Sequence, residues 1–132
     1  MSTEASNIKT VVRFFELFSS GAVADTMAMF ADDATWWVAG TLPISGTYDK
    51  TQFTELLASV LDTCTGPIRI TPKVYTAQDD RVAVEAESYT ETKSGRIYNN
   101  HYHFLVRVHG DQITSVREYL DTLHAQTVLC TP

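Results

Sequence analysis

The sequence has few basic residues and no long apolar run, and both absences exclude classes of partner. Its 132 residues include ten lysines and arginines against sixteen acidic residues, for a net charge of -6. The basic residues are scattered, so we expect no positive surface that could follow a phosphate backbone. No apolar stretch approaches the ~18 residues of a membrane span, and no basic segment followed by an apolar one opens the chain. We therefore expect a cytoplasmic protein with no nucleic-acid partner and no membrane partner.

Cysteines and cofactor motifs are also scarce. Cys64 and Cys130 belong to no CxxC or Cys/His spacing, which predicts two reduced thiols rather than a disulfide or a metal site. The sequence contains neither a glycine-rich phosphate loop nor a nucleophile elbow. His101 and His103 could bind a metal, but no third ligand is nearby. On a strand both side chains would point away from the face that carries Tyr102. We expect no cofactor and no metal, with both histidines on the outer face of a sheet.

What remains is the composition of an ordinary globular protein, with 44% hydrophobic and 20% charged residues. This length predicts one domain over residues 1–132. Apolar residues recur at helical spacing over residues 4–20, and a shorter helix is expected around residues 23–30. Asp49 and Gln52 resemble a capping box that opens a third helix, which Gly66 and Pro67 end. Between the second and third helices we expect a short strand over residues 34–38 and a loop over residues 40–48 that crosses the mouth of a cavity.

After Pro67 the apolar pattern changes to a two-residue alternation, which is typical of strands. Strands are predicted over residues 68–76, 81–92, 97–109 and 112–124, and the separators are short enough to be hairpin turns. Three helices followed by a long antiparallel meander place the chain in the α+β class, with helices covering one face of the sheet.

The alternation along residues 81–92 defines two faces without deciding which one is buried. One face carries four small or apolar side chains, Val82, Val84, Ala86 and Ser88. The other carries Ala83, Glu85, Glu87 and Tyr89. Because unpaired glutamates are rarely buried, the ordinary arrangement would leave both of them in water. On the last strand, Glu118 shares its face with Val116 and Leu120, which suggests a carboxylate in an apolar surround.

Three segments, FADDATWWVAG, GRIYNNHYHF and ITSVREYLDT, resemble landmark segments of the SnoaL-like branch of the nuclear-transport-factor-2-like superfamily. The resemblance runs from the first helix to about Asp121. It implies a cone-shaped, curved and mainly antiparallel sheet that three N-terminal helices close over one small-molecule pocket. The group is similar to ketosteroid isomerases, polyketide cyclases and limonene-epoxide hydrolases. Since this fold hosts many unrelated functions, the reaction has to be argued from individual residues.

The ketosteroid isomerase mechanism does not fit the residues that this chain has at the corresponding positions. The general base of those enzymes would fall on Val38, the acidic oxyanion donor at or near Phe104, and the tyrosine of the first helix near Phe14 or Phe15. None of these side chains can transfer a proton or donate the required hydrogen bond.

The pattern of the limonene-epoxide hydrolases matches better. Its two carboxylates would fall on Glu118 and Glu87, whereas the arginine between them would become Glu85. The tyrosine and asparagine that help to position water would become Trp36 and Val38. The chain is therefore similar to the epoxide hydrolases in its two carboxylates, but it differs at the arginine and at the residues that position water.

The resemblance thus implies a pocket with three catalytic carboxylates, Glu85, Glu87 and Glu118. It also implies nine substrate-binding residues, Phe15, Trp36, Val38, Leu57, Tyr89, Asn100, Tyr102, Phe104 and Leu120. Three carboxylates in a partly apolar cavity cannot all stay ionised, so at least one should bind a proton near neutral pH. The function expected is that of a cofactor-independent isomerase, cyclase or hydrolase acting on a small, apolar, cyclic or polyketide-like molecule. The alternative is a non-catalytic ligand-binding or dimerisation module.

With the glutamates inside the cone, Val82, Val84 and Ala86 would lie on the outer face of the sheet. That set is too apolar to be left in water. We therefore expect a homodimer that covers the outer sheet face, and related folds commonly associate in this way.

Overall fold

The computed structural model describes residues 3–132 and contains one curved sheet with four helices around it. The first half of the chain forms α1 (Thr3–Ser20), α2 (Val23–Ala28), β1 (Phe30–Val38), β2 (Gly46–Asp49) and α3 (Lys50–Asp62). The second half forms β3 (Arg69–Gln78), β4 (Arg81–Glu91), β5 (Ile97–Tyr98), β6 (His101–His109), β7 (Gln112–Leu120) and α4 (Thr122–Leu129). Within residues 3–132, no helix is both long and apolar enough to span a membrane.

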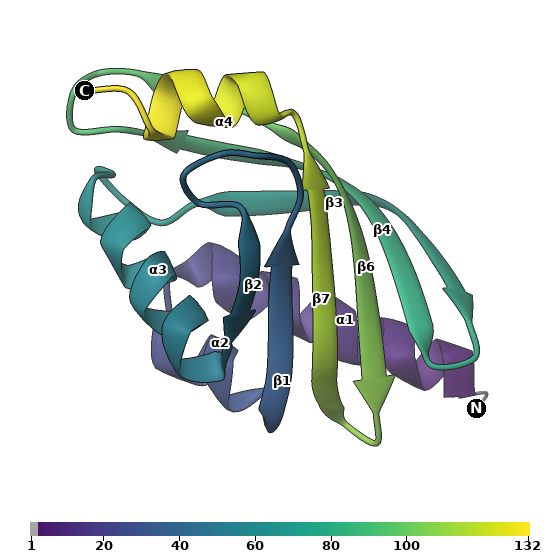
Figure 1. The fold of residues 1–132 in the computed structure, drawn as a ribbon. Coiled ribbons are helices and arrows are strands. Elements are labelled where there is room, and N and C mark those ends of the chain that lie inside the picture. The colour runs from purple at the N-terminus through teal and green to yellow at the C-terminus, as the bar shows by residue number, and fades with distance from the viewer. Residues whose placement is uncertain (1–2) are drawn as a thin grey trace.

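The sheet has the strand order β2-β1-β7-β6-β4-β3, and β5 pairs with β4. All neighbours are antiparallel except β1 and β7, which are parallel. The register shifts at Pro72 to Val74 in β3 and at Arg107 to Val108 in β6, and such irregularities bend a strand and increase its twist. Figure 1 shows the resulting curvature, with α1 packed across one face, α2 and α3 beside the edge formed by β2, and α4 at the end where the C-terminus lies. The predicted α+β class, with a mainly antiparallel sheet closed by helices, is confirmed.

The start of α3 forms as the sequence predicts. Asp49 accepts a hydrogen bond from the backbone N–H of Gln52 at 2.7 Å, and the Gln52 side chain accepts one from the backbone N–H of Asp49 at 2.9 Å. This reciprocal pair satisfies two amide groups that the first turn of a helix leaves without partners. On this helix Phe53 and Leu57 are buried in the core, while Leu61 is partly buried.

The end of the chain differs from the prediction. The strand expected over residues 112–124 stops at Leu120, and residues 122–129 form the helix α4. Asp121 caps this helix by accepting a hydrogen bond from the backbone N–H of His124 at 3.1 Å. The strand expected over residues 97–109 is also interrupted, because the Asn100 side chain accepts hydrogen bonds from the backbone N–H groups of His101 and Asp121.

The two faces of β4 are the reverse of those expected from the resemblance. Val82 and Val84 are fully buried, and Ala86 and Ser88 are almost so. Glu85 and Tyr89 are exposed on the opposite face, with Glu87 partly exposed beside them. Burying the apolar set stabilises the fold, whereas burying two carboxylates without cations would cost several kcal/mol each. The apolar set that motivated the homodimer therefore lies in the core.

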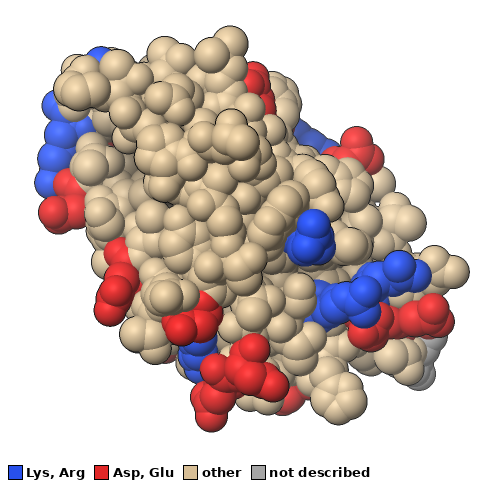
Figure 2. Space-filling model, in the orientation of Figure 1, with Lys and Arg blue, Asp and Glu red and all other residues tan. Residues whose placement is uncertain are grey.

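On the face that Figure 2 draws, charged side chains are scattered rather than gathered in one patch. Figure 2 shows lysines and arginines in separate places, most of them beside acidic residues near the rim and one nearer the middle of this face. Lys50 pairs with Asp32 at 3.7 Å, and Arg107 pairs with Asp80 at 3.2 Å.

Candidate active site

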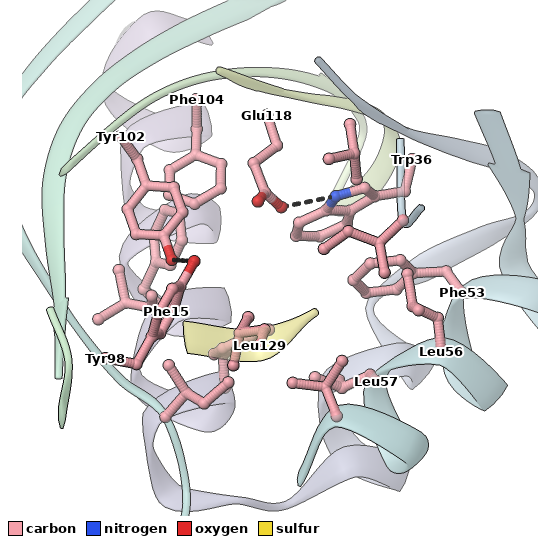
Figure 3. Close-up of a pocket in the computed structure, with 16 residues that line it drawn as sticks. Phe15, Trp36, Phe53, Leu56, Leu57, Tyr98, Tyr102, Phe104, Glu118 and Leu129 are labelled. Atoms are coloured by element: carbon pink, nitrogen blue, oxygen red, sulfur yellow. Dashed lines mark hydrogen bonds between the residues drawn. The ribbon is translucent and has the colours of Figure 1, made fainter. Parts of the chain in front are cut away.

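An apolar cavity lies inside the cone, between the concave face of the sheet and the helices α1, α3 and α4 (Figure 3). It is lined by sixteen residues, Phe15, Phe18, Trp36, Val38, Ile44, Phe53, Leu56, Leu57, Val60, Ile68, Ile70, Tyr98, Tyr102, Phe104, Glu118 and Leu129. The centre of a water molecule can occupy about 70 Å³ of this space. One water needs roughly 10–15 Å³ by that measure, so the cavity has room for a compact organic molecule.

Glu118 is, within the described part of the chain, the only charged residue that lines this cavity. It lies on β7, opposite Phe104 of β6 and beside Val38 of β1, and it points inward because it shares the parity of the buried Val116. Trp36 Nε1 donates a hydrogen bond to Glu118 Oε1 at 3.0 Å. No other hydrogen bond to this carboxyl group is formed by residues 3–132, so Oε2 faces the cavity without a protein partner.

The indole that holds Glu118 is itself fixed by aromatic packing. The ring of Trp36 stacks on Phe53 with centroids 3.9 Å apart and planes 11° apart, and Phe104 meets it edge-on at 6.2 Å. Such stacked and edge-on contacts restrict the orientation of a ring. Packing between β1 and α3 therefore fixes the indole of Trp36, which donates the hydrogen bond to the Glu118 carboxyl group.

Burial raises the pKa of Glu118 to about 7, and the hydrogen bond from Trp36 offsets part of this rise by favouring the ionised form. Near neutral pH the group is therefore present in both its acid and its base form, which is the condition for efficient proton transfer in either direction. The sequence analysis expected at least one carboxylate of the cavity to bind a proton near neutral pH, and the raised pKa of Glu118 agrees with this expectation. Its expected second cause, repulsion by Glu85 and Glu87, is wrong, because those side chains lie on the other face of the sheet.

A chain of three hydroxyl groups forms the polar end of the cavity. Tyr102 Oη lies 2.8 Å from Tyr98 Oη and 3.1 Å from Ser88 Oγ. Asn100 Nδ2 donates to Tyr98 Oη at 3.0 Å, and the backbone N–H of Asn100 donates to Ser88 Oγ at 3.0 Å. Burial is the main reason why the pKa of Tyr98 rises to about 12 and that of Tyr102 rises well above its ordinary value. Both phenols therefore keep their hydrogens across the physiological pH range.

Seven of the predicted site residues line the cavity, namely Phe15, Trp36, Val38, Leu57, Tyr102, Phe104 and Glu118. Two more, Asn100 and Leu120, lie on the inner side but are outside the lining; Asn100 is buried and supports Tyr98. The placement of Glu85, Glu87 and Tyr89 in the pocket is wrong, because strand parity turns all three outward. On the outer face Glu87 pairs with His101 at 3.4 Å and with Lys73 at 3.9 Å.

Nine of the sixteen lining residues were not among the predicted site residues, and two of these nine, Tyr98 and Leu129, come from elements that the sequence analysis did not assign correctly. Tyr98 belongs to the short strand β5, and it shares the parity of the buried Asn100 and Tyr102, so the two-residue alternation could have placed it on the inner face. Leu129 lies on α4, whose first residues were expected to belong to a strand over residues 112–124. The available signal was Asp121, a good helix-capping residue placed directly before a run with helix-forming residues.

The remaining candidate ligands lie away from the cavity. His101 and His103 are exposed on the outer face, as predicted, and residues 3–132 contain no group of three or more potential metal ligands. Cys64 and Cys130 are free thiols, as expected from their spacing. The paired tryptophans diverge as a strand requires, with Trp36 in the cavity and Trp37 on the outer face.

Solved structures with this architecture cover nearly the whole chain. An NTF2-like protein from Burkholderia xenovorans LB400 is 26% identical, with a TM-score of 0.76, over 96% of this chain and 98% of its own. A proposed SnoaL-like polyketide cyclase from Jannaschia sp. CCS1 is 18% identical, with a TM-score of 0.78, over 100% of this chain and 97% of its own.

A third structure, from Catenulispora acidiphila DSM 44928, has a ketosteroid isomerase-like fold and was solved in complex with trimethylamine. It is 18% identical, with a TM-score of 0.78, over 93% of each chain. No curated protein matches the sequence. The model of the SnoaL-like domain matches residues 11–116, and with the fold and the cavity in agreement the chain belongs to the SnoaL-like domain family.

Proposed function

We propose that this protein is a cofactor-independent enzyme that binds one compact, mostly apolar molecule in the cone and transfers a proton with Glu118. The observation that carries the proposal is a lone carboxyl group in an apolar cavity, with a pKa of about 7 and one oxygen free to meet a ligand. A buried acid costs stability, and such a cost is typically found where the group has a function.

The position of the other acids favours some reactions over others. A single carboxyl group can remove a proton from one atom of a substrate and return it to another, which is sufficient for an isomerase or for an aldol-type cyclase. Hydrolysis on the epoxide-hydrolase pattern uses two carboxylates, and the expected second one, Glu87, lies on the outer face. We therefore favour an isomerase or cyclase acting on a cyclic or polyketide-like carbonyl compound over a hydrolase.

The test is proton exchange, because it needs no knowledge of the natural product. Compact ketones such as acetophenone are incubated with the protein in D₂O, and deuterium incorporation next to the carbonyl is followed by NMR. The wild type should accelerate exchange, and Glu118→Gln should lower the rate by about 10²- to 10⁴-fold, the usual contribution of a general acid or base. Glu85→Gln, which removes an equivalent carboxylate on the outer face, should exchange like the wild type.

The second candidate function is a ligand-binding module without catalysis, favoured by the predominance of apolar residues in the cavity lining. The same experiment separates the two. Ligand binding without any exchange in the wild type would support the module and contradict the enzyme. The cytoplasmic location and the homodimer expected from the sequence remain predictions.

A further inference from the structure

The orientation of the Asn100 side chain is determined by its neighbours. Its Oδ1 accepts hydrogen bonds from the backbone N–H groups of His101 at 2.7 Å and Asp121 at 3.1 Å, so the carbonyl oxygen of the amide must lie on that side. Nδ2 then donates one hydrogen to the backbone carbonyl of Asp121 and the other to Tyr98 Oη, both at 3.0 Å. Tyr98 Oη is thus an acceptor towards Asn100, and its own hydrogen points elsewhere.

Counting hydrogens along the chain of hydroxyl groups leaves one unused. Ser88, Tyr102 and Tyr98 carry one hydroxyl hydrogen each, and two hydrogen bonds join the three oxygens. One hydrogen therefore has no partner inside the chain. This hydrogen belongs to Ser88, Tyr102 or Tyr98, and it would lie in a different place in each case.

A leftover hydrogen on Ser88 would be costly. Ser88 is 1% exposed and does not line the cavity, and a buried donor without an acceptor costs about 1–3 kcal/mol. Tyr102 donates to Tyr98 at 2.8 Å, the shorter of its two contacts, so the hydrogen of Ser88 serves the bond to Tyr102. The oxygen of Tyr98 then accepts from both Tyr102 and Asn100, and its hydrogen is the one left over.

We propose that Tyr98 is the hydrogen-bond donor that recognises the ligand, and that the cavity selects an apolar molecule carrying a neutral acceptor oxygen such as a ketone carbonyl. Tyr98 is 2% exposed and lines the cavity that also contains Glu118, and Figure 3 shows its hydroxyl beside that of Tyr102 at the cavity wall. Donation from Tyr102 and Asn100 polarises the Tyr98 hydroxyl and strengthens the bond that it gives. The inference rests on the proposed function only in that it requires a ligand in the cone.

The test compares two probes of the same shape, acetophenone and α-methylstyrene, in which a CH₂ group replaces the carbonyl oxygen. Their dissociation constants are measured by ligand-observed NMR for the wild type, Tyr98→Phe and Tyr102→Phe. The two variants are matched, because each deletes one hydroxyl from the same cavity. The wild type should prefer the ketone by about 3- to 10-fold, the range of one net hydrogen bond. Tyr98→Phe should abolish this preference, and Tyr102→Phe should retain most of it.

The carbonyl stretch of ¹³C-labelled acetophenone gives a second reading that does not depend on the variants. Bound to the wild type it should absorb at lower frequency than in hexane, because a donor lengthens the C=O bond, and Tyr98→Phe should return it towards the hexane value.

Equal binding of both probes to the wild type would overturn the assignment of Tyr98 while leaving an apolar ligand site intact. Loss of the preference in Tyr102→Phe alone would assign the donor to Tyr102 and contradict the proposal. Binding of neither probe would overturn both this inference and the proposed function, whereas binding without proton exchange would contradict only the latter.

Discussion

The ionisation of Glu118 links the chemistry of the cavity to the stability of the fold. Its pKa is about 7 in the folded protein and about 4.5 in an unfolded chain. Between these pH values the folded state holds a proton that the unfolded state has released, so the free energy of unfolding decreases as pH rises and levels off above about 7. A shift of this size corresponds to a cost on the order of 3 kcal/mol for the ionised form. The ionised Glu118 therefore lowers the stability of the fold at alkaline pH.

This linkage predicts the effect of Glu118→Gln, which keeps the shape of the side chain and removes its ionisation. At pH 8 the variant should be more stable than the wild type by roughly 2–3 kcal/mol, because the wild type alone bears a buried charge. At pH 4.5 the difference should largely vanish, since Glu118 is then protonated in the folded state. Urea denaturation at the two pH values measures both differences, with the exposed Glu85→Gln as the control. A variant no more stable than the wild type at pH 8 would show that the Glu118 carboxylate is solvated.

At the scale of elements, the sequence predicts contacts between residues that are near in the chain, but it does not predict packing between elements that are far apart in the chain. The capping box of Asp49 and Gln52 is a contact between residues three apart, and it forms as predicted. The alternation of β4 separates its two faces correctly, yet it cannot say which face meets α1, since that depends on packing with elements far along the chain. The family alignment supplied the wrong answer for Glu85 and Glu87, whereas the ordinary rule that unpaired glutamates stay in water was correct.

The buried face of α3 gives a direct prediction for stability. Leu57 lines the cavity and is 6% exposed, so Leu57→Asp places an unpaired carboxylate in the core. The cost should be several kcal/mol, which is most of the margin of a domain of this size, and soluble expression should be lost. Ala58→Asp is the matched control, because it adds the same group one position further along the helix on an exposed site. Recovery of folded Leu57→Asp protein, judged by circular dichroism, would contradict the assignment of this face.

The helix α4 contributes Leu129 to the wall of the cavity, and hydrogen bonds from Arg96 hold the C-terminal end of this helix. Arg96 Nη1 donates to the backbone carbonyl of Thr127 at 3.2 Å, in the last turn of the helix, where carbonyls lack intrahelical partners. It also donates to the carbonyl of Thr131, just beyond the helix, at 2.7 Å. Arg96→Ala should therefore speed amide hydrogen exchange in residues 122–129 and leave the exchange of β6 unchanged. Lys93→Ala, an exposed change in the neighbouring turn, should leave α4 as it is in the wild type. Unaltered exchange in α4 would mean that packing of Ala125 and Val128 alone holds this helix.

At the scale of the whole molecule, the outer face of the sheet combines features of a surface and of an interface. Trp37 lies there under the Arg117 guanidinium, which is 4.0 Å from the ring centroid, and Tyr119 meets the same indole edge-on at 5.1 Å. Tyr119 and Tyr89 are both more than 40% exposed. Aromatic residues and arginine are the types enriched in protein interfaces. These residues, rather than the buried valines expected from the sequence, are the physical reason to keep the prediction of a homodimer.

The homodimer prediction can be tested with a charge placed in the centre of this face. Sedimentation at micromolar concentration should give about twice the monomer mass of 14.7 kDa for the wild type. Trp37→Glu should shift the protein to the monomer, because it removes an aromatic anchor and would bury two like charges across a two-fold axis. Gln126→Glu adds the same charge to an exposed site on α4 and should leave the mass unchanged. A wild type that sediments as a monomer over the accessible range would contradict the prediction, and the contacts of Arg117 with Trp37 and Tyr119 would then serve only to cover the aromatic rings from water.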